Sequence, residues 1–289
     1  MADGVTGVVT LQPEEGEKVR GVAAGLGGDN ELDQITRPEL MEARRTGDVG
    51  LVHSWELVTS VDGPGTRMTM FMSGCPLRCQ YCHNPDTFEM KTGSLENVED
   101  VVKRVKRYKP IFDASGGGLT ISGGEALFQT AFTRRVLKEV HDAGIHTTID
   151  TSGFLGARVR DEDLDNIDLV LLDVKAGDEK TYKEVTRREL QPTIDFGDRL
   201  SAANKPVWIR FVVVPDLTDS PENVQNVANI VARWPNNVER VEVLPFHNMG
   251  ADKWRELGYP YTLEDTKPPA AEDVEAIRDV FRAKGFTVY

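Results

Sequence analysis

The sequence predicts an α/β fold whose strands are parallel and are connected through helices. Three observations support this prediction: short apolar runs recur along the chain, amphipathic helical patterns lie between them, and a 39% hydrophobic content over 289 residues is enough for one continuous core. Parallel strands joined in this way need right-handed crossovers. Two architectures satisfy the pattern, a doubly wound open sheet and a full or partial (β/α) barrel.

The expected strands are short runs rich in β-branched or apolar residues. They cover residues 67–72, 119–122, 147–150, 169–173, 207–214 and 241–244, and a last short strand is expected at 286–288. Within the first run, Met68, Met70 and Met72 alternate and should fill one face of the sheet as packing residues.

Helices are expected where apolar residues recur at positions i, i+3, i+4 and i+7. This spacing occurs at 98–105 and again at 224–231, where Ser220 and Pro221 provide an N-cap and a first helical residue. A last helix is expected at 274–281 and ends before Gly285. Strands and helices therefore alternate from the first strand to the end of the chain.

Residues 1–49 differ from the rest of the chain. They are acidic and rich in Gly and contain no aromatic residue, so we expect a flexible N-terminal extension with a short helix at 38–45. Residues 50–289 contain no internal repeat and no sign of a second boundary. They are expected to form a single domain.

Charge and hydropathy exclude several classes of function. With 34 Lys and Arg against 47 Asp and Glu, the net charge is −13, which disfavours binding to nucleic acid or to anionic membranes. No apolar run approaches the about 20 residues that cross a bilayer, and the N-terminus lacks a secretory pattern. We expect a cytoplasmic protein that is monomeric.

All three cysteines lie in one loop after the first expected strand. Cys75, Cys79 and Cys82 have the spacing C-x3-C-x2-C, which rules out a disulfide framework and suits the thiolate ligands of an iron–sulfur cluster. Because the chain has no fourth cysteine, one iron of a cubane would stay open for substrate. The alternative is a structural zinc site completed by His83, although such sites usually use two separated ligand pairs.

A glycine-rich segment follows the second expected strand. In Ser122-Gly123-Gly124-Glu125 the glycines allow a ligand to approach the backbone, and the carboxylate of Glu125 is suited to accept hydrogen bonds from an ammonium group. The segment also fits an ordinary turn from strand to helix with a capping carboxylate. A phosphate-binding P-loop is excluded, because Gly116-Gly117-Gly118 is not followed by Gly-Lys-Ser/Thr.

Further polar residues lie at the ends of the later strands. Each has an ordinary structural explanation, such as a turn cap, an ion pair or a loop histidine. The carboxyl ends of parallel strands meet at one edge, however, and α/β sheets bind their ligands there. The residues concerned are Asp150, Thr151, Asp173, Lys175, Arg210 and His247.

These motifs together resemble a known family. The cysteine loop, with Tyr81 just before its last cysteine, is similar to the signature of the radical S-adenosylmethionine superfamily, and Gly123-Gly124-Glu125 resembles its glycine-rich motif. From about residue 50 to the C-terminus the chain resembles the activating enzymes of glycyl-radical enzymes, particularly those of pyruvate formate-lyase. The segments that carry this likeness are 63–65, 82–84, 114–127, 150–153, 207–215 and 244–250.

The resemblance implies a partial (β/α)6 barrel of the TIM type with parallel strands. It also implies a [4Fe-4S] cluster on Cys75, Cys79 and Cys82, with S-adenosylmethionine bound to the open iron. The residues expected at the amino end of this cofactor are Gly123, Gly124 and Glu125, and those expected elsewhere around it are Tyr81, Asp150, Lys175, Arg210 and His247. A monovalent cation, Na⁺ or K⁺, would be held by Asp150, Thr151, the carbonyl of Leu171 and Asp173, where relatives are expected to have Met at position 171.

The implied reaction is formation of a glycyl radical on pyruvate formate-lyase, with flavodoxin or ferredoxin as electron donor. The chain has no extra cysteines between Cys82 and Gly123 and none in a C-terminal segment, which argues against relatives with auxiliary clusters. Three alternatives stay open. They are an activator of another glycyl-radical enzyme, a radical enzyme acting on a small molecule, and a non-catalytic module that binds zinc or a cluster.

Overall fold

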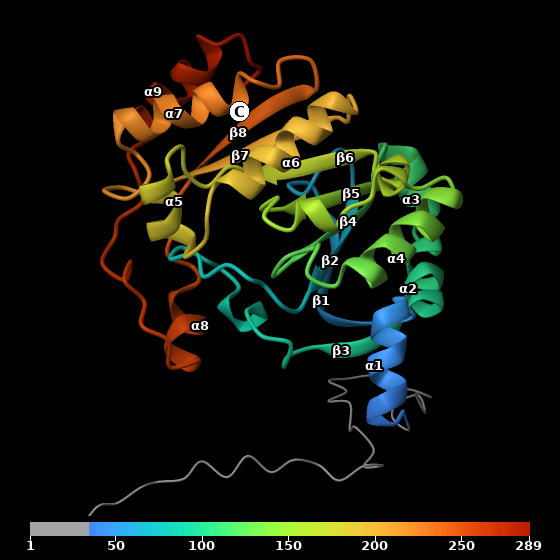
Figure 1. The fold of residues 1–289 in the computed structure, drawn as a ribbon. Coiled ribbons are helices and arrows are strands. Elements are labelled where there is room, and N and C mark those ends of the chain that lie inside the picture. Colours follow the sequence, from blue (N-terminus) through green and yellow to red (C-terminus); the bar gives the residue numbers. More distant parts are fainter. Residues whose placement is uncertain (1–34) are drawn as a thin grey trace, which may run out of the picture.

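The computed structural model describes residues 35–289 and contains one eight-stranded sheet, in the order β3-β1-β2-β4-β5-β6-β7-β8 (Figure 1). Six neighbouring strands are parallel. They are β2 (Arg67–Met72), β4 (Gly118–Gly123), β5 (His146–Thr151), β6 (Leu169–Asp173), β7 (Val207–Val213) and β8 (Val238–Pro245). Within the described residues β8 has no strand partner beyond β7, so the sheet curves without closing. The predicted partial barrel is therefore confirmed.

Two antiparallel strands at one edge of the sheet were not predicted. β1 (Val49–Thr59) pairs with β2, and β3 (Ser94–Asn97) pairs with β1. The first half of β1 is buried, whereas its second half lies mostly at the surface and mixes polar with apolar side chains. Although β1 lies between β3 and β2, a strand with such a mixed outer half gives no clear apolar run over its whole length.

Helices cover the outer face of the parallel strands (Figure 1). The helices predicted at 98–105, 224–231 and 274–281 are confirmed as α2 (Val98–Lys106), α7 (Pro221–Val231) and α9 (Ala271–Arg282), and Ser220 caps α7. The strand expected at 286–288 is reduced to a single bridge between Val288 and Val241. The other helices between the strands are α3 (Lys109–Ser115), α4 (Thr130–Asp142), α5 (Glu179–Thr186) and α6 (Gln191–Ala202), and α8 (Ala251–Glu256) follows the last strand.

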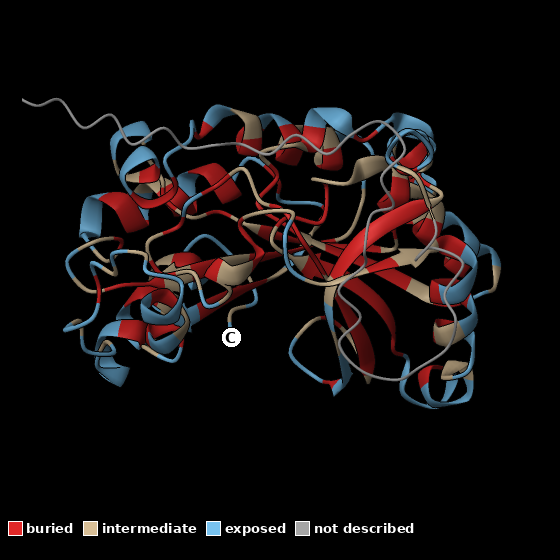
Figure 2. Ribbon diagram, turned by 90° about the horizontal axis from the view of Figure 1, so that it is seen from below, coloured by how far each residue is buried: buried red, intermediate tan, exposed pale blue. Residues whose placement is uncertain are grey.

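The main core lies between the sheet and these helices, and Figure 2 shows buried strands beneath helices with exposed outer faces. Met68, Met70 and Met72 are almost completely buried in this core, as predicted for packing residues. Because side chains alternate along β2, Arg67 and Thr69 face the opposite side, the interior of the barrel. The sheet thus separates an apolar outer layer from an interior that contains polar side chains.

The helix expected at 38–45 is confirmed as α1 (Arg37–Thr46). Its Leu40 packs against Val49, Leu51 and Leu95, which joins this segment to the edge of the sheet. The flexible extension was predicted for residues 1–49; residues 37–46 of it form α1, and residues 1–34 lie outside the described residues. Across residues 35–289, every helix falls short of the length and apolarity that a bilayer crossing requires.

Candidate functional site

A cavity of about 750 Å³ brings most of the predicted site residues together at the carboxyl edge of the parallel strands. The cysteine loop forms one wall, and the ends of β4, β5, β6, β7 and β8 form the others. Among the predicted residues, those that line it are Cys75, Cys79, Tyr81, Cys82, Gly123, Gly124, Glu125, Asp150, Asp173, Lys175, Arg210 and His247. Thr151 and Leu171 lie behind this surface.

Hydrogen bonds hold the cysteine loop on both sides. The backbone N–H groups of Arg78 and Gln80 donate to the carbonyls of Thr186 and Val185 at the end of α5, over 2.9 and 3.0 Å. On the opposite side, the indole Nε1 of Trp254 in α8 donates to the carbonyl of Cys82 over 2.8 Å. The loop is therefore fixed between two helices before any cofactor binds.

The three thiols are reduced and face a common space. Burial and the neighbouring Cys79 raise the pKa of Cys82 to about 12, and burial and the nearby thiols also raise the pKa of Cys75. Three thiolates at such a site need a positively charged group between them. An iron–sulfur core supplies that charge and the matching soft metal. The residues present thus fit a cluster held by three cysteines.

A single zinc ion fits less well. Within residues 35–289, no three His, Cys, Asp or Glu side chains are arranged to hold one metal ion. His83, the expected fourth ligand, instead stacks on His247 with ring centroids 4.1 Å apart, and its Nε2 lies 3.2 Å from the carbonyl oxygen of His247. The geometry therefore favours a cluster over the zinc alternative.

Gly123 and Gly124 bring the end of β4 against the start of the cysteine loop. A Cβ on Gly123, whose φ is +109°, would lie 2.1 Å from the backbone nitrogen of Met72, and one on Gly124 would lie 2.5 Å from the carbonyl of Gly74. The N–H of Gly124 donates to the carbonyl of Met72 over 2.8 Å. Any side chain here would push the loop away from the strand.

The carboxylate of Glu125 is buried and already holds the end of β5. It accepts hydrogen bonds from the hydroxyls of Thr151 and Ser152, over 2.5 and 2.6 Å, and from the backbone N–H groups of Ser152 and Leu127. From the sequence, we expect the carboxylate of Glu125 to accept hydrogen bonds from an ammonium group. In the structure this carboxylate fixes the turn after β5 while forming part of the cavity wall.

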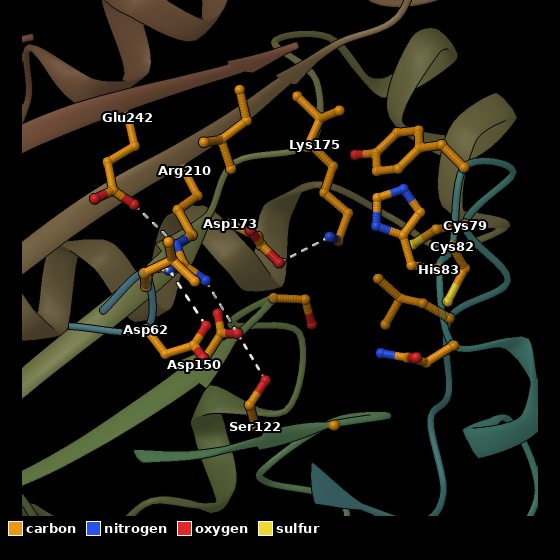
Figure 3. A pocket seen from close by; sticks show the side chains of 18 of the residues that line it. Asp62, Cys79, Cys82, His83, Ser122, Asp150, Asp173, Lys175, Arg210 and Glu242 are labelled. Carbon is orange, nitrogen blue, oxygen red and sulfur yellow. Dashed lines mark hydrogen bonds and ion pairs between the residues drawn. The ribbon is translucent and has the colours of Figure 1, made fainter. Parts of the chain in front are cut away.

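Arg210 is the centre of a charged network that Figure 3 shows across the cavity wall. Its guanidinium donates to Glu242 over 3.0 Å and to Asp150 over 3.3 Å, and it lies 3.7 Å from Asp62. The parallel register places Asp173, Arg210 and Glu242 in one row across three strands. Although burial alone would lower the pKa of Arg210, the carboxylates of Asp150 and Glu242 raise it.

The network leaves several polar atoms without a partner. Burial raises the pKa of Asp150 to about 6. The positive charge of Arg210 and a 2.7 Å hydrogen bond from the Ser122 hydroxyl to Oδ2 of Asp150 both oppose this rise. Within the described residues, Asp150 Oδ1, His247 Nδ1 and the Tyr81 hydroxyl are buried and form no hydrogen bond. Since buried polar atoms are nearly always satisfied, these three atoms on residues that line the cavity are available to a polar ligand.

The comparisons with known proteins agree with this site. The family model of the radical SAM superfamily matches residues 69–228. The chain belongs to this superfamily. Its membership implies a [4Fe-4S] cluster and S-adenosylmethionine as cofactors, which the cysteine loop and the unpartnered polar atoms can accommodate.

Similar proteins identify the family within this superfamily. The chain is 41% identical over 246 residues to the pyruvate formate-lyase-activating enzyme of Listeria monocytogenes, covering 82% of this chain and 98% of that protein. It is 46% identical over 217 residues to that of Clostridium pasteurianum, covering 75% and 90%. This radical SAM protein is therefore a member of the family of pyruvate formate-lyase-activating enzymes.

A solved structure supports the fold alone. A radical SAM methyltransferase from Sphaerobacter thermophilus matches with a TM-score of 0.56 at 15% identity, over 89% of this chain and 82% of that chain. Such a likeness confirms the radical SAM barrel. It carries no information on the substrate.

Sequence reasoning missed several residues of this radical SAM site. Asp62 and Glu242 contact Arg210, and Ser152 and Trp254 hold Glu125 and the cysteine loop. A signal was present for Glu242, a charged residue inside the apolar run of β8. For Trp254, 172 residues after Cys82, the sequence holds no local signal.

Proposed function

We propose that this chain activates pyruvate formate-lyase by generating a radical on a glycine of the lyase. The observation that carries the proposal is the single cavity in which the three cysteines face Gly123-Gly124 and the charged network around Arg210. The names of relatives at 41% and 46% identity support this choice of substrate. So does the absence of further cysteines anywhere in the chain.

Cys75, Cys79 and Cys82 would hold the cluster, and the remaining cavity residues would hold S-adenosylmethionine. With both cofactors bound, the chemistry supplied at this site would be one-electron reductive cleavage of the sulfur–C5′ bond of S-adenosylmethionine, the source of a 5′-deoxyadenosyl radical. Gly123, Gly124 and Glu125 would form the surface beside the amino end of S-adenosylmethionine. Those expected beside its carboxylate, ribose and adenine are Tyr81, Lys175, Arg210 and His247.

The electrostatics of the cavity support these assignments. Lys175 is nearly buried and pairs with Asp173 over 2.8 Å, so its ammonium is held in place for an anionic group of the ligand. Arg210 is likewise fixed by its carboxylate partners. Groups held in this way need little reorganisation when the ligand binds. The protein walls also shield the ligand from water, which a radical reaction requires.

We further propose that a monovalent cation, Na⁺ or K⁺, binds beside the cofactor. Asp150 Oδ1 offers an oxygen without a partner, and Asp173, the carbonyl of Leu171 and Thr151 are the other proposed ligands. The side chain of Leu171 packs against Leu169 and Trp208, so only its carbonyl is available. The hydroxyl of Thr151 donates to Glu125 and accepts from the backbone N–H of Gly153, which leaves one lone pair for the ion.

Three further parts of the proposal concern the surroundings of the enzyme. Flavodoxin or ferredoxin would deliver the electron, the enzyme would act as a monomer, and it would act in the cytoplasm. The cysteine count of three, clustered within eight residues, supports the last point, because it does not suit a disulfide framework and fits a reducing compartment.

Electron paramagnetic resonance tests the proposal. The anaerobically reconstituted chain is mixed with S-adenosylmethionine, a reductant and purified pyruvate formate-lyase. We expect a glycyl doublet on the lyase and one 5′-deoxyadenosine for each radical. A lyase in which the target glycine is replaced by alanine serves as the matched control.

Two results would contradict the proposal. One is a glycyl doublet that forms only on another glycyl-radical enzyme. The other is rapid cofactor cleavage with a small metabolite and none with the lyase.

A further inference from the structure

Three exposed arginines lie on the outer side of the cysteine loop. Arg78 is within the loop between Cys75 and Cys79, and Arg187 and Arg188 directly follow α5. We refer to Arg78, Arg187 and Arg188 as the arginine group. It is separate from the charged network around Arg210, which is inside the cavity.

The arginine group is fixed relative to the cysteines. Nη1 of Arg78 donates to the carbonyls of Cys75 and Leu77, each over 2.7 Å. Nε of Arg188 donates to the carbonyl of Pro76, also over 2.7 Å. Both guanidinium groups therefore touch the backbone that carries the first cysteine.

Aromatic side chains support two of the guanidinium groups. Arg78 stacks over Phe88 with 4.7 Å between guanidinium carbon and ring centroid, and Arg188 lies over Phe154 at 5.8 Å. Each aromatic ring covers one face of a guanidinium and helps to hold it in position. The group is thus a built surface with positions set by hydrogen bonds and by stacking.

The arginine group carries its positive charge without a direct ion pair, although the carboxylate of Glu89 lies near enough to Arg78 to interact with it electrostatically. Within the described residues, none of the three forms an ion pair with a carboxylate; Arg78 and Arg188 use their donors on backbone carbonyls. The exposed side chains of Glu184 and Glu189 are close in sequence but do not pair with them. In a chain of net charge −13, the outer side of the loop therefore carries three arginines that form no ion pair with a carboxylate in the described residues.

We infer that the arginine group is the docking surface for a small acidic electron-transfer protein. The net negative charge of the chain disfavours contact with such a carrier over most of its surface, whereas the arginine group attracts it beside the cysteines, because complementary charge governs the encounter of two proteins. The docked carrier loses one electron, the group held by the cysteines gains that electron, and no atom is exchanged. This inference rests on the proposed function, since it assumes a redox group on the three cysteines.

Binding of purified flavodoxin and of ferredoxin tests this inference directly. The double variant Arg187→Glu/Arg188→Glu reverses two charges and keeps Arg78, which bonds to two loop carbonyls. The control is Lys106→Glu/Arg107→Glu, the same charge change at exposed, unpaired residues at the end of α2. Affinities of the cluster-loaded proteins are measured by calorimetry at low and at high ionic strength.

We expect the double variant to bind the carrier at least about tenfold more weakly at low ionic strength, and the control to stay within about twofold of the wild type. The affinity of the wild type should fall as salt is added, whereas that of the double variant should change little. The side chain of Arg187 contacts no loop carbonyl. The single variant Arg187→Gln should therefore weaken carrier binding as well, but by less than the double variant.

A chemical reductant separates docking from damage to the loop. Dithionite should produce the same reduced-cluster signal in all variants. Equal carrier affinity in wild type and double variant would overturn the inference, even if the lyase is activated. Conversely, normal docking without a glycyl radical would refute the proposed function and leave the docking surface intact.

Discussion

Two arginines inside the barrel are similarly buried but have opposite surroundings. Arg67, at the start of β2, is completely buried and donates to neutral oxygens, among them the hydroxyls of Thr120 and Thr148 and the carbonyl of Leu119. Arg210, in β7, donates to carboxylates at the cavity wall. The hydrogen bonds of Arg67 thus end on neutral groups in the closed interior of the barrel. Those of Arg210 end on ionised carboxylates at the wall of the cavity.

The pKa values of the two arginines reflect this difference. Burial lowers the pKa of Arg67 to about 10, and the charges of Asp62 and Asp168 oppose this effect only in part. The carboxylates around Arg210 act in the opposite direction and raise its pKa. In this barrel, the arginine that stabilises the fold donates to neutral groups. The arginine at the cavity wall, where we expect a charged ligand, pairs with carboxylates.

The largest effect on activity is expected in the cysteine loop, at the wall of the cavity. Cys79→Ala removes one of the three cluster ligands, so the reconstituted protein should lose the intact cluster and all cleavage of S-adenosylmethionine. The free energy of unfolding of the metal-free protein should change little, since alanine is a small apolar replacement for a buried thiol. Iron analysis and chemical denaturation measure the two properties on one sample. Retention of four irons by the variant would contradict the assignment of ligands.

Arg67→Met tests the buried hydrogen bonds at the start of β2. The substitution keeps an unbranched side chain but leaves several buried oxygens without a donor, so we expect a loss of about 3 kcal/mol in the free energy of unfolding. The matched control is Arg107→Met on the exposed side of α2, which should change stability by less than about 0.5 kcal/mol. Equal stabilities of the two variants would show that Arg67 does not organise the interior.

Arg210→Lys should affect binding more than folding. Lysine keeps the positive charge but cannot donate to Glu242 and Asp150 through a planar fork, so we expect about tenfold weaker binding of S-adenosylmethionine. Calorimetry on the cluster-loaded protein gives this value, and Arg240→Lys, at a residue that pairs with Glu242 but lies opposite Trp208 in the register, is a useful comparison. Unchanged affinity would place the cofactor away from this network.

The smallest effect is expected at His146, beside Arg67. Burial and the positive charge of Arg67 lower the pKa of His146, so between the lowered value and the ordinary 6.5 the unfolded chain binds the proton more readily than the folded one. The contribution of His146 to stability is therefore complete above pH 6.5 and decreases as the pH falls through this window. His146→Asn should flatten the dependence, as measured by denaturation at several pH values. A variant with the same slope as the wild type would refute this account.

The sequence predicted the six parallel strands, the cysteine loop and the residues at the strand ends, because these are local patterns. It did not predict β1, whose outer half mixes polar and apolar residues, or the partners of the charged groups. Arg210 meets Glu242 only because β7 and β8 pair in one particular register. Glu125 meets Ser152 through the packing of two successive strand ends. Such contacts depend on the assembled fold, and no single segment of the sequence specifies them.

The central claim is that the cysteine loop and the charged network serve one bound cofactor pair. The most direct measurement is the electron paramagnetic resonance spectrum of the reduced, anaerobically reconstituted protein with and without S-adenosylmethionine. We predict a reduced-cluster signal whose shape changes when S-adenosylmethionine is added, with a higher concentration required in Arg210→Lys. A signal that is identical with and without S-adenosylmethionine would contradict the claim.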